Sequence, residues 1–278
     1  MIHWFPGHMA KARRMITEQS AMVDIICEII DARIPASSRN PDLDELTKNK
    51  ARLIILNRVD LADPTRTVRW VEFLRSGAMV LECDSKSGRG TANFEAAVRS
   101  ALREKLERYA QRGMAGKPLK AMIVGIPNVG KSTFINKIAR RKAAIASDRP
   151  GVTRGRQWVT AGKSLDLLDT PGILWPKIGT EEQAENLAFT GAIKDAVTDV
   201  EDLAAKLCAK LSVLYPELLA KRYKLTIAEQ TGFELLTEAA RNRGFLLTDG
   251  EFDTLRMANI MLDEFRGGKI GRITLEQP

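Results

Sequence analysis

The sequence predicts an α/β fold with a mixed, mostly parallel sheet, followed by an all-α region at the C-terminal end. Three observations indicate this architecture. Short apolar runs alternate with amphipathic stretches up to Asp169, which is the pattern of strand–helix–strand units. Residues 125–132 match the phosphate-loop pattern GxxxxGK[ST], which requires a strand before it and a helix after it. Beyond Gly172 only helical periodicity remains.

The first part of the chain contains several apolar runs bounded by turn residues. Nearly continuous apolar runs are typical of strands that are covered on both faces of a parallel sheet. Before them, His3 and His8 lie in a segment of aromatic residues, proline and glycine, which we expect to be an ordered loop. A surface or packing role is the simplest interpretation of His8 from its neighbours alone. The elements expected up to Asp169 are helices over residues 10–21, 65–75, 94–112 and 133–138, and strands over residues 23–30, 53–56, 79–81, 121–124, 157–160 and 164–168.

Polar residues follow two of these strands. Asn57 and Asp60 come after one strand, and Ser85 and Lys86 come after the next. The carboxyl ends of parallel strands meet at one edge of the sheet, where ligands bind. A carboxylate can accept two hydrogen bonds from the N1–H and the exocyclic amine of guanine, which adenine cannot supply, and an asparagine can serve the other edge of the base. The NxxD pattern is also common in turns, so it gains weight only together with the phosphate loop.

The phosphate-loop pattern predicts a nucleoside triphosphate site. In this setting the backbone N–H groups of the loop and of the helix N-terminus face the phosphates. Lys131 reaches the outer phosphates, and the hydroxyl of Ser132 joins the Mg²⁺ shell. An ordinary glycine turn with a surface lysine is the alternative interpretation. The residues expected to bind phosphates are Asn128, Val129, Gly130, Lys131, Ser132 and Thr133, together with Gly172.

Two further segments are predicted to complete the phosphate and metal site. The turn-rich residues 148–153 could swing over the phosphates, and Thr153 is expected to meet Mg²⁺ when the γ-phosphate is present. Asp169 ends an apolar strand and suits a water-mediated Mg²⁺ ligand. Gly172 can donate its N–H to the γ-phosphate. A simple strand-ending turn is the alternative interpretation of this second segment.

The charge balance is strongly basic. A net charge of +8 and a sequence pI near 9.5 favour a polyanionic partner, although a solvated basic surface is the default alternative. Basic residues lie on both sides of the phosphate loop in the sequence, which predicts nucleic acid next to the nucleotide site. They are Arg99, Arg103, Lys105, Arg108, Arg112, Lys117 and Lys120 before the loop, and Lys137, Arg140, Arg141, Lys142, Arg149, Arg154 and Arg156 after it.

Length, hydropathy and cysteine content limit the class of protein. The 278 residues are enough for one large or two modest domains. No apolar run reaches the length of a membrane-spanning helix, and the N-terminus lacks the order of a signal peptide. We therefore expect a cytoplasmic protein with no membrane partner. Cys27, Cys83 and Cys208 are far apart, and we expect reduced core thiols with no disulfide-linked partner.

The C-terminal part is predicted to be a separate helical domain. Thr180 followed by Gln183, and Asp249, are expected to cap helix N-termini there. Its basic residues are mixed with many acidic ones, and a solvated helix surface explains most of them. The predicted division is residues 1–175 for the nucleotide-binding domain with its N-terminal arm, and residues 176–278 for the helical domain. Helices are expected over residues 181–189, 199–214, 216–223, 227–242 and 248–265.

The set of motifs resembles the translation-factor class of GTPases in a rearranged order. Ordinarily the phosphate loop comes first and the guanine motif near the end, whereas here residues 57–60 precede the phosphate loop. This order predicts a circularly permuted P-loop GTPase domain, which can form because the termini of a domain usually lie close together. With the segments Trp4-Phe5-Pro6-Gly7-His8-Met9 and Asp31-Ala32-Arg33-Ile34-Pro35, the whole chain is similar to the bacterial ribosome biogenesis GTPase A family of the YlqF/YawG type.

The resemblance implies a function, cofactors and partners. Members of this family are cytoplasmic, bind GTP or GDP with Mg²⁺, and act late in the maturation of the large ribosomal subunit. The precursor particle stimulates hydrolysis, and the C-terminal helical domain contacts its rRNA. A hydrophobic residue, here Ile173, follows the DTPG motif where Ras-like enzymes use glutamine to orient the water. The resemblance assigns that role to the histidine that corresponds to His8, and it implies that Asn128 helps to hold K⁺ near the phosphates.

Two positions depart from the family pattern. Arg58 replaces the lysine of the guanine motif NKxD; its long stem could cover the base, but its planar head is not equivalent. The serine motif has alanine before lysine in the family, whereas Asp84, Ser85 and Lys86 are consecutive here, which leaves its register open. The residues expected to bind guanine are Asn57, Arg58, Asp60, Ser85 and Lys86.

Three interpretations of function follow. The first is a GTPase whose nucleotide controls docking to the large-subunit precursor and whose hydrolysis promotes late assembly of that particle. The second is a nucleotide-dependent RNA-binding module with little hydrolysis of its own. The third is an ATPase that remodels RNA, which Arg58 keeps open.

Overall fold

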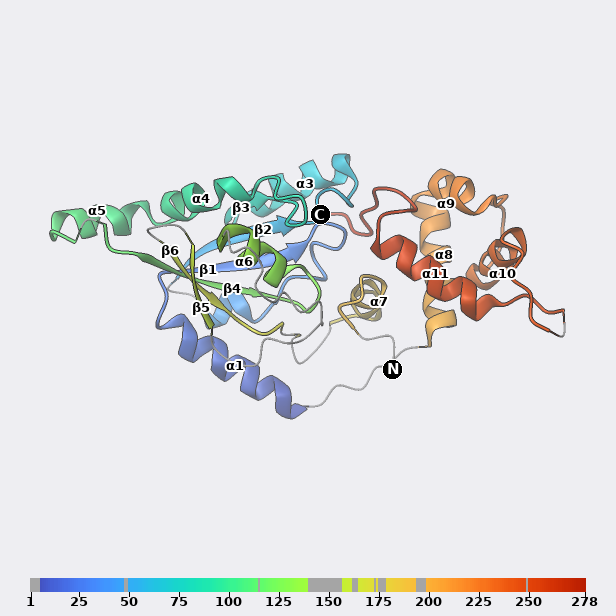
Figure 1. Cartoon of the computed structure of the whole chain (residues 1–278), viewed down its shortest axis with the longest axis horizontal. Helices are drawn as coiled ribbons and strands as arrows, with labels where there is room; N and C mark the ends of the chain where they lie inside the picture. The colour runs from blue at the N-terminus through green and yellow to red at the C-terminus, as the bar shows by residue number, and fades with distance from the viewer. Residues whose placement is uncertain are drawn as a thin grey trace.

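The computed structural model describes residues 6–47, 50–114, 116–139, 157–161, 165–172, 174, 179–193, 199–248 and 250–278, and for residues 6–12 the backbone alone. A half built on a β-sheet and a half built from helices lie side by side (Figure 1). Helix α1, the first described element, lies below the sheet half, and the chain ends next to helix α3, Pro64–Arg75.

A single sheet organises the first half. The described residues form six strands in the order β3-β2-β1-β4-β6-β5, with β5 antiparallel to β6 and all other pairs parallel. This confirms the predicted mixed, mostly parallel sheet. The strands that carry the predicted guanine and serine motifs, β2 and β3, precede β4 in the chain but lie in the same sheet, separated from it by β1. Their bounds are β1 Ile25–Asp31, β2 Ala51–Asn57, β3 Met79–Glu82, β4 Leu119–Gly125, β5 Gln157–Ala161 and β6 Leu165–Asp169.

Helices cover both faces of the sheet. All seven residues of β1 are buried, which explains why its sequence is nearly all apolar, with Glu28 and the terminal Asp31 as its charged residues. Ile29 packs in one core with Phe94 of α4 and Phe134 of α6. On the opposite face Ile26 packs with Ile16 of α1, while Ile30 packs with Trp70 of α3. The helices that cover the two faces are α1 Pro6–Ser20, α2 Leu43–Leu46, α3 Pro64–Arg75, α4 Phe94–Ala101 and α6 Lys131–Ala139.

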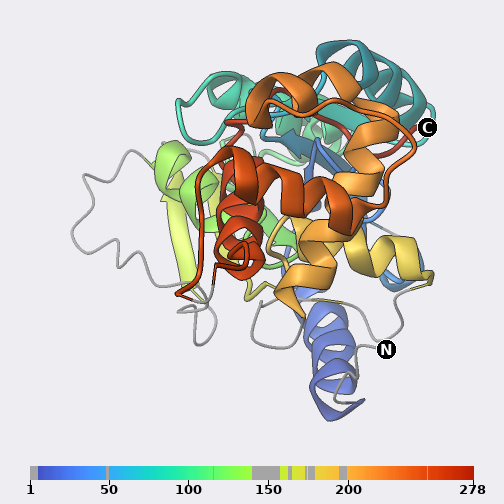
Figure 2. The same ribbon diagram turned by 90° about the vertical axis from the view of Figure 1, so that its right-hand side faces the viewer.

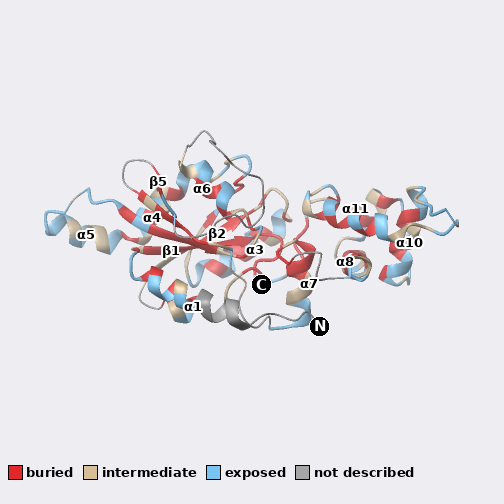
Figure 3. Ribbon diagram, turned by 60° about the horizontal axis from the view of Figure 1, so that its bottom comes forward, coloured by how far each residue is buried: buried red, intermediate tan, exposed pale blue. Residues whose placement is uncertain are grey.

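The helix predicted over residues 94–112 is divided in two. Helix α4 ends at Ala101; the next residue, Leu102, has a φ of −108° and a ψ of 17°, which are not helical, and α5, Arg103–Gln111, follows directly. Leu102 is buried in the core of the sheet half, whereas none of the residues of α5, all of which are described, is buried. Figure 3 shows α5 as an exposed helix that projects beyond the sheet. The break places one leucine in the core and turns the basic helix outward.

The second half consists of α7 Glu181–Phe189, α8 Val200–Leu214, α9 Pro216–Tyr223, α10 Gly232–Asn242 and α11 Thr254–Arg266. Helices α10 and α11 pack on α8 (Figure 2). The predicted cap at Thr180 is present, since its side chain accepts from the N–H of Gln183. Two helices begin later than predicted: a capping box between Thr231 and Glu234 starts α10, and Asp253 caps α11. Asp249, the predicted cap, lies outside the described residues.

Two further predictions from composition can be compared with the structure. Cys27, Cys83 and Cys208 are all buried and free, as predicted. Burial raises the pKa of each thiol, which keeps it protonated and unreactive. Among the described residues, no helix is both long and apolar enough to cross a membrane.

The last residues of the chain return to the sheet half. The N–H of Ile273 donates to the carbonyl of Leu61, and the N–H of Leu275 donates to that of Arg33. The side chain of Arg272 donates to the carbonyl of Val59, inside the predicted guanine motif, at 2.8 Å. We call residues 272–276 the C-terminal tail. The division into residues 1–175 and 176–278 stays a prediction, but the tail packs on the first of these parts.

Candidate nucleotide site

The phosphate loop joins β4 to α6 at the carboxyl edge of the sheet. Gly130 has a φ of +100°, a conformation that favours glycine. A Cβ at this position would also lie 2.5 Å from Nδ2 of Asn57. Val129 is buried and anchors the loop in the core. Glycine at position 130 is therefore required both by the backbone conformation and by the neighbouring asparagine.

Lys131 is the first residue of α6 and is folded back over the loop. Its Nζ donates to the carbonyls of Gly125 at 3.0 Å and Ile126 at 2.8 Å. Burial lowers the pKa of Lys131 from 10.5 to about 8, against the opposing effect of Asp169. Ser132 and Thr133 are exposed in the first turn, where helical N–H groups have no carbonyl partner within the helix. This end of α6 can therefore receive an anion.

The segment after β6 lies against the phosphate loop. Asp169 is buried and pairs in register with Ile123 of β4. A Cβ on Gly172 would lie 2.9 Å from Cα of Pro127 and 3.0 Å from Nζ of Lys131. The structure thus brings Gly172 to the predicted phosphate-binding lysine. Thr153 and Ile173 lie outside the described residues.

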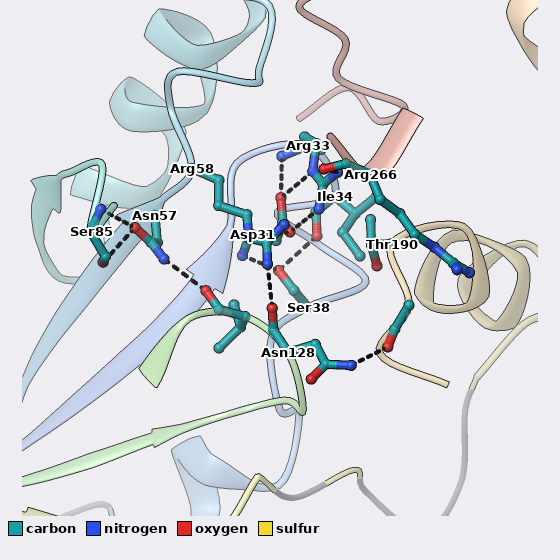
Figure 4. A network of polar contacts seen from close by, with 12 residues as sticks. Asp31, Arg33, Ile34, Ser38, Asn57, Arg58, Ser85, Asn128, Thr190 and Arg266 are labelled. Carbon is teal, nitrogen blue, oxygen red and sulfur yellow. Dashed lines mark hydrogen bonds and ion pairs between the residues drawn. The ribbon is translucent and has the colours of Figure 1, made fainter. Parts of the chain in front are cut away.

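Asn57 connects the predicted guanine motif to the serine motif and to the phosphate loop. Its Oδ1 accepts hydrogen bonds from the backbone N–H of Ser85 at 3.0 Å and from its hydroxyl at 2.7 Å. Its Nδ2 donates to the carbonyl of Val129 at 2.7 Å (Figure 4). Lys86 is exposed, and its backbone N–H donates to Asp84. In this structure Ser85 is the residue of the serine motif that meets Asn57, and Asn57 ties that motif to the phosphate loop.

Asp60 presents a buried acceptor without a donor. Its Oδ1 is buried and has no hydrogen-bond partner among the described residues. Leaving a buried acceptor unpaired costs free energy, so such an atom is usually hydrogen-bonded by a ligand or a water molecule. The atom therefore fits the carboxylate that the guanine motif requires.

Arg58 makes contacts that the sequence did not predict. Its φ of 62° is rare for a residue other than glycine. Its Nη2 donates to the carbonyl of Asn128 at 2.6 Å, and its Nε lies 3.7 Å from Oδ2 of Asp31. The head of Arg58 thus binds the phosphate loop and a carboxylate.

Asp31 and Arg33, which belong to the family motif at residues 31–35, also lie near this site. Asp31 is buried, and its carboxylate accepts from Nε of Arg33 at 3.0 Å and from its Nη2 at 2.7 Å. Burial would raise the pKa of Asp31, but Arg33 and then Arg58 hold it below the ordinary value. The sequence signal that could have identified Asp31 and Arg33 is an Asp-x-Arg pattern at the end of a buried strand.

The prediction of a loop at the N-terminus is wrong from Pro6 onward. Helix α1 begins at Pro6 and includes His8, because proline is well suited to the first position of a helix. The side chain of His8 lies outside the described part of the structure.

The prediction that the basic residues surround the nucleotide site is also wrong for the residues before the loop. Helix α5 lies at the amino edge of the sheet, at the end opposite the phosphate loop (Figure 1). Strand β4 spans the distance between them, so neighbours in sequence are far apart in space. After the loop, Lys137 is described and exposed, and the other basic residues lie outside the described residues.

Comparisons with known proteins agree with this geometry. A family model described as 50S ribosome-binding GTPase matches residues 120–228. The chain is 45% identical over 280 residues to ribosome biogenesis GTPase A of Priestia megaterium, covering 100% of this chain and 97% of the relative. It is 43% identical over 279 residues to the protein of the same name from Bacillus cereus, covering 100% and 94%. The crystal structure of GNP-bound YlqF from T. maritima has a TM-score of 0.67 and 28% identity, covering 96% of this chain and 98% of that chain.

These relatives extend over the whole chain, and the strands that carry the guanine motif precede the phosphate-loop strand in sequence but lie in the same sheet, separated from it by β1. The chain is a circularly permuted GTP hydrolase that binds guanine nucleotides, and it belongs to the ribosome biogenesis GTPase A family.

Proposed function

We propose that this GTPase binds the maturing large ribosomal subunit in the cytoplasm, hydrolyses GTP to promote late assembly, and is stimulated by the particle. The observation that carries this proposal is Asn57, which links three motifs of a guanine-nucleotide site through its contacts with Ser85 and Val129. The relatives are named for ribosome biogenesis, and the matching family model is named for 50S ribosome binding, which supports the choice of partner.

The phosphates are bound by Lys131, by Gly172 and by the N–H groups of residues 128–133. Asn57 and Asp60 select guanine with the help of Arg58, Ser85 and Lys86. The unpaired Oδ1 of Asp60 supports guanine, because the N1–H and amine of that base would supply the missing donors. Among the described residues, the buried ammonium of Lys131 donates to carbonyls of Gly125 and Ile126, which supports its turning toward a more strongly attracting phosphate.

The metal ligands of this proposal are Ser132, Thr153 and Asp169 for Mg²⁺. The exposed hydroxyl of Ser132 and the carboxylate of Asp169 are oxygen donors of the kind that Mg²⁺ prefers. The ion would neutralise the charge that develops on the transferred phosphoryl group. K⁺ is a second candidate ion at Asn128. Nδ2 of this residue donates to Gly191, so its Oδ1 is the atom left for a cation.

The role of orienting the attacking water is assigned to His8. Ile173 has no group that can hydrogen-bond a water, although it follows the motif where related enzymes have glutamine. We propose that RNA positions the N-terminal arm at the nucleotide site and that His8 then orients or activates the water. The imidazole is suited to this task because its ordinary pKa lies near neutral pH.

The partner rRNA is supported by a basic groove at the amino edge of the sheet. The groove has a volume of about 790 Å³. Lys105 is paired with Asp24, but Arg108 and Arg112 form no ion pair among the described residues. The ring of Tyr109 has Lys105 and Lys117 within 5.6 Å and 5.4 Å of its centre. Cations around this half-buried aromatic ring suit phosphates and stacked bases of RNA. Basic residues that line the groove are Lys50, Arg103, Lys105, Arg108 and Arg112.

GTP turnover with and without purified large subunits, at matched K⁺ and salt, tests the proposal. We expect stimulation by the particle and co-sedimentation that depends on which guanine nucleotide is present. His8→Ala is expected to lose the stimulation and to keep binding. An unstimulated wild-type enzyme would favour the nucleotide-dependent RNA-binding module, and equal competition by ATP would contradict guanine selection.

A further inference from the structure

The tip of the phosphate loop is held on two sides. The backbone carbonyl of Asn128 accepts from Nη2 of Arg58 at 2.6 Å, and its side-chain Nδ2 donates to the carbonyl of Gly191 at 2.7 Å (Figure 4). Asn128 has a φ of 58°, which a residue other than glycine adopts only where its surroundings determine it. The loop is therefore fixed between the guanine motif and the residues that follow α7.

Asp31 connects Arg58 to a second, fully buried guanidinium. Its Oδ2 accepts from Nη2 of Arg33 at 2.7 Å and lies 3.7 Å from Nε of Arg58. Its Oδ1 accepts from the backbone N–H and from Nε of Arg33, both at 3.0 Å. Asp31 is 2% exposed and Arg33 is 1% exposed, so water cannot replace either partner. One carboxylate thus binds a cation that contacts the phosphate loop and a cation that contacts the helical half.

Arg33 reaches the end of α11. Its Nη1 donates to the carbonyl of Arg266 at 3.3 Å, and its guanidinium lies 5.4 Å from the centre of the Phe265 ring. The last carbonyls of a helix have no partner within the helix and favour a cation. The side chain of Arg266 in turn donates to the carbonyls of Phe189 at 3.1 Å and Ala188 at 2.9 Å, at the end of α7.

These contacts close a ring between the phosphate loop and the helical half. From Asn128 the ring passes through the guanine motif and β1 to α11, and it returns through α7 to Asn128. Such a ring gives a contiguous set of contacts through which a movement of the loop would reach α11. We call it the Asp31 ring, and its members are Asn128, Arg58, Asp31, Arg33, Arg266 and Gly191.

We propose that Arg58 is a positioning residue that couples the nucleotide on the phosphate loop to docking of the helical half through the Asp31 ring. A nucleotide that holds the loop in this geometry stabilises docking, and docking strengthens nucleotide binding by the same factor. Arginine suits the role because one rigid plane offers separate nitrogens to the carbonyl and to the carboxylate, whereas lysine offers a single point charge. The inference rests on the nucleotide site proposed above, and it assigns Arg58 a task other than covering the base.

Hydrogen exchange of the full-length protein tests the coupling. Amide exchange over residues 254–276, which cover α11 and the C-terminal tail, is followed with and without saturating GDP. We expect GDP to slow this exchange in the wild type. Arg58→Gln is expected to lose most of that nucleotide-dependent protection even when every GDP site is filled, a result that weaker binding of the base alone would not produce.

Arg66→Ala is the matched control. Arg66 binds the carbonyl of Thr274 in the C-terminal tail at 2.8 Å but is not a member of the Asp31 ring. Its removal is expected to speed exchange of the tail with and without GDP, and to leave the difference between the two states unchanged.

Arg266→Gln tests the opposite direction, since it breaks the ring on the helical side and outside the proposed nucleotide-binding residues. We expect GDP affinity to fall about fivefold or more, the lower end of typical coupling between two sites, and Arg66→Ala to keep it. Three results would overturn the coupling: wild-type protein that binds GDP without added protection, protection that survives Arg58→Gln at saturation, or unchanged GDP affinity in Arg266→Gln. Wild-type protein that does not bind GDP would instead overturn the proposed nucleotide site.

Discussion

The two edges of the sheet use basic side chains in opposite ways. At the carboxyl edge, Lys131 and Arg58 turn inward, where loop carbonyls and Asp31 bind them. At the amino edge, Arg108 and Arg112 are exposed and form no ion pair among the described residues. A buried cation is costly unless polar groups surround it, so the first group is held at the nucleotide site by its partners, while the second is available to a polyanion. The net charge of +8 therefore combines two different functions.

At the carboxyl edge, the largest effect is expected for Asp31→Asn, which removes the carboxylate of the buried ion pair with Arg33. Removing one partner of a buried ion pair costs about 3–5 kcal/mol in the free energy of unfolding, because Arg33 stays buried without its carboxylate. Urea unfolding measures this loss. Asp42→Asn is the control, since the partner of Asp42, Arg13, lies 3.4 Å away and is 44% exposed. That exposed pair is expected to contribute roughly 0.5 kcal/mol or less. If Asp31→Asn lowered the free energy of unfolding as little as Asp42→Asn does, the structural role assigned to the buried ion pair would be contradicted.

Lys131→Ala is expected to weaken GDP binding by about 100-fold or more, as the loss of two hydrogen bonds to charged groups implies. Fluorescence titration with a labelled GDP measures the affinity. Lys137→Ala removes an exposed lysine from the same helix and should keep the affinity. Similar losses for both variants would show that net charge, and not the buried position of Lys131, governs binding.

Reversal of charge at the amino edge tests the other side of the comparison. The double variant Arg108→Glu with Arg112→Glu should weaken binding to large subunits about tenfold. It should also make the negative slope of log affinity against log salt less steep, by about 1.5. Arg69→Glu with Arg75→Glu is the matched control, because these exposed arginines lie on α3 and outside the groove. The amino edge loses its assigned role if the two double variants behave alike.

The smallest expected effect is on the pH dependence of nucleotide binding. The pKa of Lys131 is lowered to about 8, so its amine is charged below that pH and neutral above it in the free protein. Phosphates favour the charged form, so affinity should be full below pH 8 and fall as pH rises through 8, by about fourfold at pH 8.5. Calorimetry in buffers of different ionisation heat should detect proton uptake. Constant affinity from pH 7 to 8.5 without proton uptake would contradict the buried lysine.

Local patterns predicted the elements better than their ends. The nearly continuous apolar run of β1 and the glycine-rich turn before α6 are encoded by adjacent residues, and both are present. The break at Leu102 was not predicted, because helical periodicity continues through it and only the core decides that this leucine turns inward. Helix α10 begins at Gly232 and not at residue 227, although the capping box of Thr231 and Glu234 was visible in the sequence.

The same distinction applies to the site. Asn57, Ser85 and the phosphate loop could be placed together because each follows a parallel strand, and such strands end at one edge. The contact of Arg58 with Asn128 was not predicted, since the side chain was expected to cover the base. The pairing of Asp31 with Arg33 and the end of α11 joins residues that are separated by more than half of the chain.

From the sequence alone come the phosphate loop, the guanine motif, their permuted order and the split between a sheet and a helical region. These follow from short-range spacing, which neighbouring residues fully encode. Only the tertiary structure reveals that the basic helix α5 lies at the edge opposite the phosphate loop and that the C-terminal tail packs on the guanine motif. The physical reason is that burial and pairing of charges depend on which distant segments meet, and composition and periodicity carry no record of those meetings.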